Sequence, residues 1–297
     1  GLLWLDPMPA ENDLGKAYIN YYTHEDADVP SATPLRRAYR QIKTAYLANK
    51  FGYSKKDVSV LFRLLGSCFY LAPGRRASLD ASVFHLPAQP GARLLEVGCG
   101  NGGAMRRMAD LGWDVEGVDF DEKSVSNARS KGLNVHHGDL VAQEFESGSF
   151  DAVVMSHVIE HVPNPLRVLQ ESHRVLKPGG VLVVLTPNTE SLGHSIYGRS
   201  WRGLEPPRHL HLFNRKSLRN LALEAKFDDV RCRSSVRARK IFLQSRLCAS
   251  DGVIDLESGV SVPLRIWAVM MEVVESIANL FVRNVGEELT LIAKRHV

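Results

Sequence analysis

The chain has 297 residues, of which 44% are apolar and 24% charged, and its formal net charge at pH 7 is +4. These are ordinary globular values, so they exclude a disordered or collagen-like chain, and the charge is too small to indicate nucleic-acid binding by itself. At roughly 150 residues per domain, the length allows one large domain or two smaller ones. The four cysteines have no CxxC spacing, which argues against a zinc ribbon or a disulfide framework.

We expect a cytoplasmic protein with reduced thiols. No run of 18 uncharged apolar residues occurs, so no transmembrane helix is predicted. The first residues lack the basic segment of a signal peptide.

The first 90 residues predict a helical extension. Thr33 and Pro34 are typical of an N-cap followed by proline in the first helical turn, and apolar residues continue at helical spacing to Tyr46. The segment that begins at Ser54 resembles a capping box, so a second helix is expected from there through Leu65.

From residue 91 onward, short apolar strands alternate with helices, which predicts a doubly wound, mostly parallel sheet of the α/β class. Helices are expected between the strands and over residues 215–226. The expected strands lie at residues 94–97, 115–118, near 135, 150–155, 181–185 and 288–293.

Two later segments stand apart from this alternation. Residues 188–213 lack regular periodicity, and long loops in compact domains usually serve as lids or binding loops, so we expect an acceptor lid here. Apolar residues at helical spacing from Ile266 to Phe281 predict an amphipathic helix within an insertion around residues 263–284. Such a stripe is expected to pack on the core or to form the face of a homodimer.

A glycine-rich turn, GCGNGG at residues 98–103, follows the first strand of the α/β region and opens a helix. Glycines let the backbone approach a ligand closely, and a helix N-terminus attracts negative charge. Asp119 lies 21 residues after Gly98, where a ribose-binding acid is expected. Two ligands fit, a dinucleotide and S-adenosylmethionine. Glu96 discriminates between them, because a carboxylate repels a pyrophosphate but attracts the ammonium and sulfonium groups of S-adenosylmethionine.

The segment LLEVGCGNG at residues 94–102 resembles the first motif, E/D-x-G-x-G-x-G, of the class I S-adenosylmethionine-dependent methyltransferases. The resemblance covers residues 90–190 and includes VDF at 118–120, GDL at 138–140 and LKPGG at 176–180. It implies a Rossmann-like, seven-stranded sheet in a methyltransferase domain over residues 91–297, behind a cap at 1–90. The cofactor-binding residues that it implies are Glu96, Gly98, Gly100, Asp119, Phe120, Asp139, Leu140 and Ser156.

Residues 201–213, WRGLEPPRHLHLF, are similar to a subgroup of small-molecule methyltransferases of sugar, polysaccharide and natural-product biosynthesis, distantly like the ubiquinone-pathway O-methyltransferases. The resemblance implies methyl transfer to a hydroxyl of a sugar, a lipid-linked intermediate or a natural product. Methyl transfer to a hydroxyl benefits from a base that titrates near neutrality, and histidine is the natural candidate. The predicted catalytic residues are His157, His161 and His209, each of which could instead be a hydrogen-bonding loop residue.

We predict no metal ligand, although His157, Glu160 and His161 form a set that could bind a divalent ion. In the ubiquinone-pathway enzymes, similar positions carry acids and one histidine around magnesium. Here His157 replaces an acid, and a hard ion prefers oxygen to imidazole.

Residues 199–246 contain 13 Lys or Arg against 4 Asp or Glu, which indicates either a solvated edge strand or an anionic small-molecule acceptor. Arg231, Arg233, Arg237 and Arg239 alternate and would share one face of a strand. No nucleic-acid partner is expected, because no aromatic-interleaved RNA module is present and SHVI at 156–159 replaces the motif of amino-directed nucleic-acid methyltransferases. A non-catalytic S-adenosylmethionine-binding scaffold subunit and an NAD(P)-dependent oxidoreductase remain as alternatives.

Overall fold

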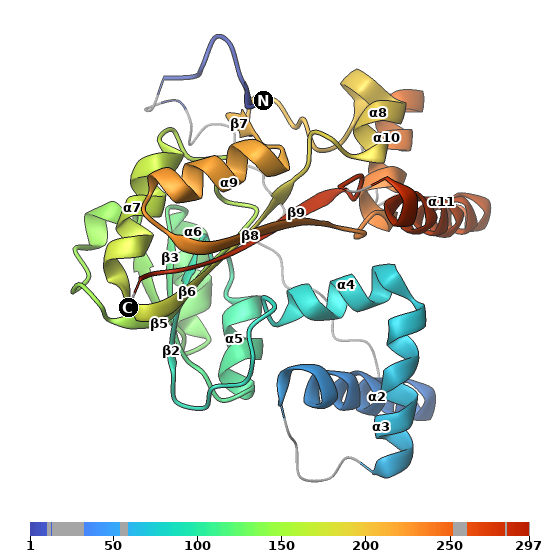
Figure 1. Ribbon diagram of the computed structural model, residues 1–297, viewed down its shortest axis with the longest axis horizontal. Coiled ribbons are helices and arrows are strands. Elements are labelled where there is room, and N and C mark those ends of the chain that lie inside the picture. Colours follow the sequence, from blue (N-terminus) through green and yellow to red (C-terminus); the bar gives the residue numbers. More distant parts are fainter. Residues whose placement is uncertain (11–12, 14–32, 54–58, 252–259, 283, 297) are drawn as a thin grey trace. The chain divides into compact units, whose positions relative to one another are not determined.

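Figure 1 shows the computed structural model of the chain, which describes residues 1–10, 13, 33–53, 59–251, 260–282 and 284–296. Seven strands follow one another in the sheet order β4-β3-β2-β5-β6-β9-β8. The pairs β2–β3, β3–β4 and β5–β6 are parallel, whereas β9 runs antiparallel to both β6 and β8. This confirms the predicted seven-stranded, mostly parallel sheet. The strands are β2 (Arg93–Val97), β3 (Asp114–Asp119), β4 (Asn134–His137), β5 (Phe150–Ser156), β6 (Leu176–Pro187), β8 (Asp228–Ser235) and β9 (Glu288–Lys294).

Contacts divide the chain into two compact units. The first unit consists of Gly1–Tyr21 and Asp139–Val297, and the second unit is Tyr22–Gly138. This division differs from the expected boundary near residue 90, because the helices after residue 33 group with the strands that carry the glycine-rich turn.

In the second unit, the helix predicted after Thr33 is confirmed as α2 (Pro34–Phe51), with the Thr33 hydroxyl accepting the backbone N–H of Arg36. The next helix, α3 (Val60–Ser67), has Ser59 as its N-cap, with the Ser59 hydroxyl accepting the backbone N–H of Phe62. The expected start at Ser54 lies outside the described residues. The unit also contains η3 (Cys68–Leu71), α4 (Pro73–Ser82), α5 (Gly103–Asp110) and α6 (Glu122–Ser130).

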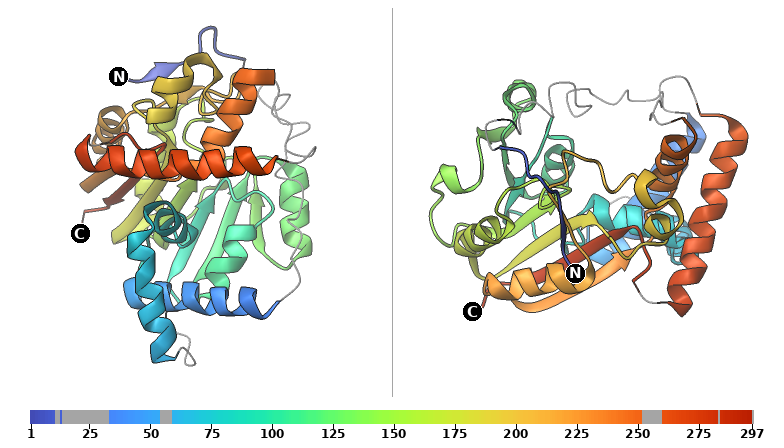
Figure 2. Two further views of the ribbon diagram at one scale, coloured as in Figure 1. Left: turned by 90° about the vertical axis from the view of Figure 1, so that its right-hand side faces the viewer. Right: turned by 90° about the horizontal axis from the view of Figure 1, so that it is seen from above.

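In the first unit, the central strand β5 and the second half of β6, from Val181 onward, are mostly apolar and buried, as expected for parallel strands covered on both faces. Helix α9 (Arg215–Glu224) packs along β8 and β9 (Figure 1). Helices α8 (Leu192–Tyr197), α10 (Arg239–Asp251) and α11 (Val262–Phe281) form a separate group, in which α10 contacts both of the others (Figure 2). Helix α7 (Pro165–Val175) precedes β6. The unit also contains the short 3-10 turns η4 (Val141–Gln143) and η5 (Gly198–Ser200).

The segment at residues 188–213 is more regular than predicted. It contains α8, η5 and the short strand β7 (His211–Leu212), which pairs antiparallel with β1 (Leu3–Trp4). The sequence shows little periodicity here because each of these elements is too short to complete a hydrophobic repeat. Whether the segment acts as an acceptor lid stays a prediction.

Helix α11 has its apolar stripe on the outside. Ile266, Met270 and Val273 are 56%, 59% and 52% exposed, whereas Glu275 is completely buried. The expectation that this stripe packs on the core is therefore wrong. The acidic side of the helix faces inward instead, because it has hydrogen-bonding partners inside the unit. Within the described part of the chain, no helix, α11 included, is long and apolar enough to cross a bilayer.

Candidate active site

The glycine-rich turn of the second unit connects β2 to α5 in a conformation that only glycine adopts easily. Gly98, Gly100 and Gly102 all have positive φ angles, 72°, 53° and 79°. A side chain at Gly102 would also meet Leu133, because an added Cβ would lie 2.2 Å from its Cδ1 atom. The turn therefore keeps the backbone bare where a ligand must approach closely.

Asp119 at the end of β3 stabilises this turn. Its Oδ2 accepts the backbone N–H of Gly100 at 2.7 Å, and its Oδ1 accepts that of Asp121 at 2.9 Å. Burial raises the pKa of Asp119, and these two hydrogen bonds oppose the rise. Each carboxylate oxygen retains a second lone pair that could accept a ribose hydroxyl. The predicted ribose contact is thus compatible with the geometry, and the same carboxylate has a structural role that the sequence did not reveal.

Glu96 at the end of β2 is a buried carboxyl group in need of a donor. It is 5% exposed, and its Oε2 has no hydrogen-bond partner among the described residues. Burial raises the pKa of Glu96 to about 8; the positive charge of Arg107 opposes this rise and the negative charge of Asp119 adds to it. An ammonium group would satisfy the unpaired oxygen and favour the ionised carboxylate. The residues of this turn therefore fit the amino-acid end of S-adenosylmethionine.

The adenine-side residues are less distinctive. Phe120 is 51% exposed, which leaves its ring accessible for the predicted contact. In the first unit, Asp139 accepts the backbone N–H of Ala142 at 2.7 Å and so supports η4, while Leu140 is buried. Contacts of Phe120, Asp139, Leu140 and Ser156 with the cofactor stay predictions.

His157 follows β5 with a left-handed backbone, φ 57°, and lies between two buried carboxylates. Its Nδ1 is 3.3 Å from Oε1 of Glu160, and its Nε2 is 3.0 Å from Oε2 of Glu288. Burial opposes protonation, but the hydrogen bonds and charges of Glu160 and Glu288 outweigh it and raise the pKa of His157 to about 10. The ring is thus hydrogen-bonded to Glu288 and ion-paired with Glu160, an arrangement that disfavours the predicted role of His157 as a base.

Glu160, His161 and His209 come together in the first unit. One potential ligand atom from each lies within 4.8 Å of the others. Burial raises the pKa of Glu160, but the hydrogen bond from His157 and the three neighbouring imidazoles outweigh it and lower the pKa to about 2. Burial lowers the pKa of His209 to about 4, so its imidazole is neutral at pH 7. We call these three residues the Glu–His–His cluster. The sequence predicted both histidines, but it did not predict that His157 would be excluded from the group.

The sequence did not predict two residues, Glu288 and Arg237, at this place beside His157. Glu288, at the start of β9, is 131 positions away from His157, and Arg237 donates to the same Glu288 oxygen at 2.8 Å. Glu288 belongs to no motif, and the alternation that singled out Arg237 gave no signal of its partner. Only the antiparallel return of β9 beside β6 brings Glu288 to the end of β5.

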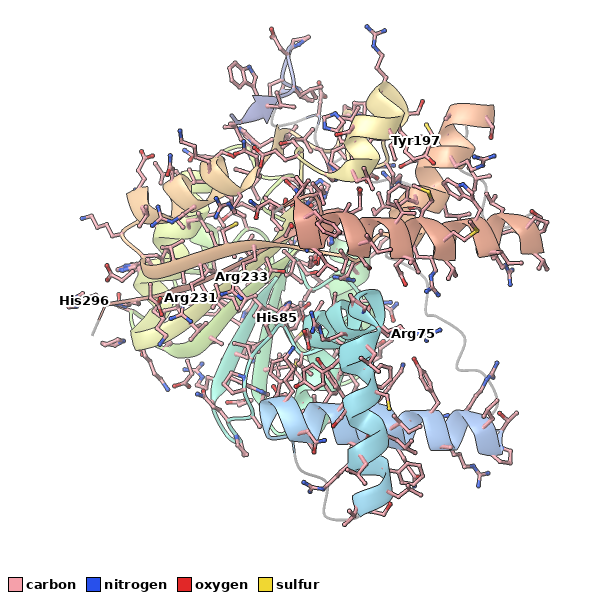
Figure 3. All side chains as sticks on the ribbon, turned by 45° about the vertical axis from the view of Figure 1, so that its right-hand side comes forward. Arg75, His85, Tyr197, Arg231, Arg233 and His296 are labelled. Carbon is pink, nitrogen blue, oxygen red and sulfur yellow. The ribbon has the colours of Figure 1, made fainter. Side chains whose placement is uncertain are left out.

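The alternating arginines do not form one open cationic row. Arg231 and Arg233 lie along β8 (Figure 3), but Arg231 is paired with Asp229 at 2.9 Å. Arg237 is paired with Glu288 and Arg239 with Glu272. β8 is the edge strand of the sheet, as one of the two interpretations expected.

Comparisons with known proteins identify the family of the chain. Residues 72–231, more than half of the chain, match the model of a family described as "Methyltransferase domain". The ubiquinone biosynthesis O-methyltransferase of Cereibacter sphaeroides is 37% identical over 124 residues, which cover 39% of this chain and 50% of that protein. The malonyl-[acyl-carrier protein] O-methyltransferase of Enterobacter lignolyticus is 32% identical over 141 residues, 47% of this chain and 55% of the other. The chain thus spans about half the length of these curated relatives.

Solved structures show the same fold at low sequence identity. Phosphoethanolamine N-methyltransferase 2 of Haemonchus contortus, in complex with S-adenosyl-L-methionine, has a TM-score of 0.52 and 20% identity, covering 86% of this chain and 57% of that one. A putative methyltransferase of Haloferax volcanii, solved with its Trm112 activator, has a TM-score of 0.51 and 19% identity, covering 77% and 96%.

The fold and the glycine-rich site together define a Rossmann-like protein that binds S-adenosylmethionine. The chain belongs to the methyltransferase-domain family of class I S-adenosylmethionine-dependent enzymes. This confirms the predicted family and cofactor and removes the oxidoreductase alternative.

Proposed function

We propose that the chain transfers the methyl group of S-adenosylmethionine to a hydroxyl oxygen of a small-molecule acceptor. The observation that carries this proposal is the Glu–His–His cluster, two of whose residues follow β5 at its carboxyl end, where open α/β sheets bind their ligands. The curated relatives named above are called O-methyltransferases, which supports oxygen as the acceptor atom.

Methyl transfer from a sulfonium is an in-line displacement, so the enzyme mainly aligns the acceptor and helps its hydroxyl to lose a proton. The cluster can help in two ways. The imidazole of His161 or of His209 can accept the proton, or a cation held among the three side chains can make the hydroxyl more acidic. Both ways depend on the same residues, and an amine acceptor that is already neutral would need neither.

His157 is proposed to act as a positioning residue rather than as a base. Its ring joins Glu160 on one side to Glu288 and Arg237 on the other, so it holds the cluster's carboxylate in place. Loss of this ring would leave two buried carboxylates facing each other without a cation between them, and this would destabilise the folded protein.

The chemical class of the acceptor is a separate proposal. A sugar, a lipid-linked intermediate or a natural product fits the similarity of residues 201–213, and the curated relatives are named for ubiquinone biosynthesis and for a malonyl-[acyl-carrier protein]. The basic composition of residues 199–246 gives little support to an anionic acceptor. The reason is that Arg231, Arg237 and Arg239 already have acidic partners. The cytoplasmic location also stays a prediction.

The test is methyl-label transfer from S-adenosylmethionine to a panel of matched alcohols and amines. We expect label in an ether product, a fall of about 100-fold or more in kcat for Glu160→Gln, and unchanged affinity for S-adenosylhomocysteine. His173→Gln is the matched control, because His173 lies on α7 outside the cluster. Label only on nitrogen or carbon would contradict the proposal, and cofactor binding without any transfer would favour the scaffold alternative.

A further inference from the structure

We propose that the Glu–His–His cluster binds one divalent transition-metal ion of the Zn²⁺ type, which joins the loop after β5 to the loop before β7. A carboxylate oxygen and two imidazole nitrogens whose positions converge within 4.8 Å can all reach one ion. Glu160 is completely buried and His209 is 7% exposed, so the ligand atoms converge in the interior of the first unit rather than on its surface.

The hydrogen bonds of the two histidines orient them for this role. Nδ1 of His161 lies 3.0 Å from the carbonyl oxygen of Arg208, and Nδ1 of His209 lies 2.6 Å from that of Gly203. A carbonyl oxygen only accepts, so each Nδ1 carries a hydrogen, and Nε2 is the ring atom that would bind an ion. Metal-binding histidines almost always donate their other ring N–H to a carbonyl or carboxylate in this way, because the bond fixes the tautomer and the ring orientation.

Glu160 is held from several sides. Its Oε2 accepts the hydroxyl of Thr186 at 2.9 Å, and its backbone carbonyl accepts the N–H groups of Leu210 and His211 at 2.7 and 3.1 Å. The two loops that would share the metal are therefore already joined by backbone hydrogen bonds. A site with its ligands fixed beforehand loses little conformational entropy on binding the ion.

A second carboxylate, that of Glu205, lies near the cluster, with Oε2 3.6 Å from Nε2 of His209. Arg202 and Arg208 both form ion pairs with Glu205, so this carboxylate is already engaged. The carboxylate that would bind the ion is that of Glu160, whose buried Oε1 has no hydrogen-bond partner among the described residues and lies 3.3 Å from Nδ1 of His157.

This set of metal ligands differs from the set that the resemblance indicated, which was His157, Glu160 and His161. His157 is not a member, because its ring lies between Glu160 and Glu288, and the third ligand comes instead from residues 201–213. Two imidazoles and one carboxylate suit Zn²⁺, Co²⁺ or Ni²⁺, whereas Mg²⁺ prefers six oxygens. Three protein ligands also leave a position for water or for an acceptor oxygen.

The test is titration of chelator-treated, full-length protein with Zn²⁺ alone, followed by calorimetry, and with Co²⁺ alone, followed by visible absorption. We expect one ion per chain with a Kd in the micromolar range or below, and cobalt bands of a four- or five-coordinate site. Neither measurement needs cofactor or acceptor, so the outcome is independent of which atom is methylated. Mg²⁺ at millimolar concentration should not displace Co²⁺.

The variant His209→Ala should bind Zn²⁺ at least 100-fold more weakly, while His173→Ala should bind it like the wild type. Retained affinity for S-adenosylhomocysteine would show that His209→Ala is folded. A wild-type protein that binds no Zn²⁺ below millimolar concentration would overturn the proposal, and so would a folded His209→Ala that binds Zn²⁺ as tightly as the wild type. The cobalt spectrum of the wild type tests the site even if the variant does not fold.

Discussion

In the first unit, the buried carboxyl group of Glu275 binds the backbone of Glu287, whose own carboxyl group is also buried. Oε1 of Glu275, on α11, accepts the backbone N–H of Glu287 at 2.7 Å. The Glu287 carboxylate in turn accepts N–H groups from Gly193, at the start of α8, and from the Trp201 ring. This connection explains why α11 presents its acidic side to the interior.

Stability should therefore decrease as pH rises. Burial, together with the charge of Glu287, raises the pKa of Glu275 to about 9. The folded state then binds more protons than the unfolded state between about pH 4.5 and 9, so the free energy of unfolding falls as pH rises through that range. Glu275→Gln should flatten the pH dependence of Tm and raise stability by about 1–3 kcal/mol at pH 8. The control is Glu272→Gln, on the same helix but paired with Arg239; parallel Tm curves for wild type and Glu275→Gln would contradict this explanation.

Cofactor binding should release a proton. At pH 7 the carboxyl of free Glu96 is mostly protonated, since its pKa is about 8, and the cofactor's ammonium group favours the ionised form. Calorimetry with S-adenosylhomocysteine in phosphate and in Tris should therefore show a buffer-dependent enthalpy equivalent to about one proton. Glu96→Gln should abolish the difference and weaken binding. Equal enthalpies in the two buffers for the wild type would rule out this role for Glu96.

The carboxylate of Asp119 should contribute to cofactor affinity. Asp119→Asn keeps the size of the side chain but replaces one acceptor of a backbone N–H with a donor, and it removes the charge offered to the ribose hydroxyls. We expect a loss of about 1.5–3 kcal/mol, roughly 10- to 150-fold in Kd for S-adenosylhomocysteine. Asp114→Asn, at the exposed opposite end of β3, should leave the Kd unchanged. An unaltered Kd in Asp119→Asn would remove the ribose assignment.

The predicted homodimer through α11 remains a prediction, and the outward apolar stripe supports it. An exposed apolar face of this length is unusual in a monomer. The described residues of its exposed side include one charged residue, Arg265, which disfavours an anionic lipid surface. Light scattering after size exclusion should give a dimer for the wild type and a monomer for Val273→Glu. The control Leu223→Glu, at a 43% exposed position on α9, should stay dimeric. A wild-type monomer at 100 μM, a concentration on the order of the weakest specific dimers, would exclude this interface.

The sequence by itself determined the α/β alternation, the glycine-rich turn and the acids after β2 and β3. These features depend on local spacing, because the glycines, the strand and the helix N-terminus lie within about ten residues and form one structural unit. The position of Glu96 follows from that unit, and Asp119 ends the next strand, so both were candidates from spacing alone. The antiparallel final strand was also recognisable as an apolar run.

Only the tertiary structure decided which side chains meet across long separations. His157 looked like a base because it follows a strand, but Glu288, from a strand that begins 131 residues later, engages its second nitrogen. Helical periodicity located the apolar stripe of α11 but could not show which side faces the protein, since a buried stripe and an exposed one have the same period. The inward direction of its acidic side follows from the hydrogen bond between Glu275 and the backbone of Glu287, a contact that no spacing within the helix encodes.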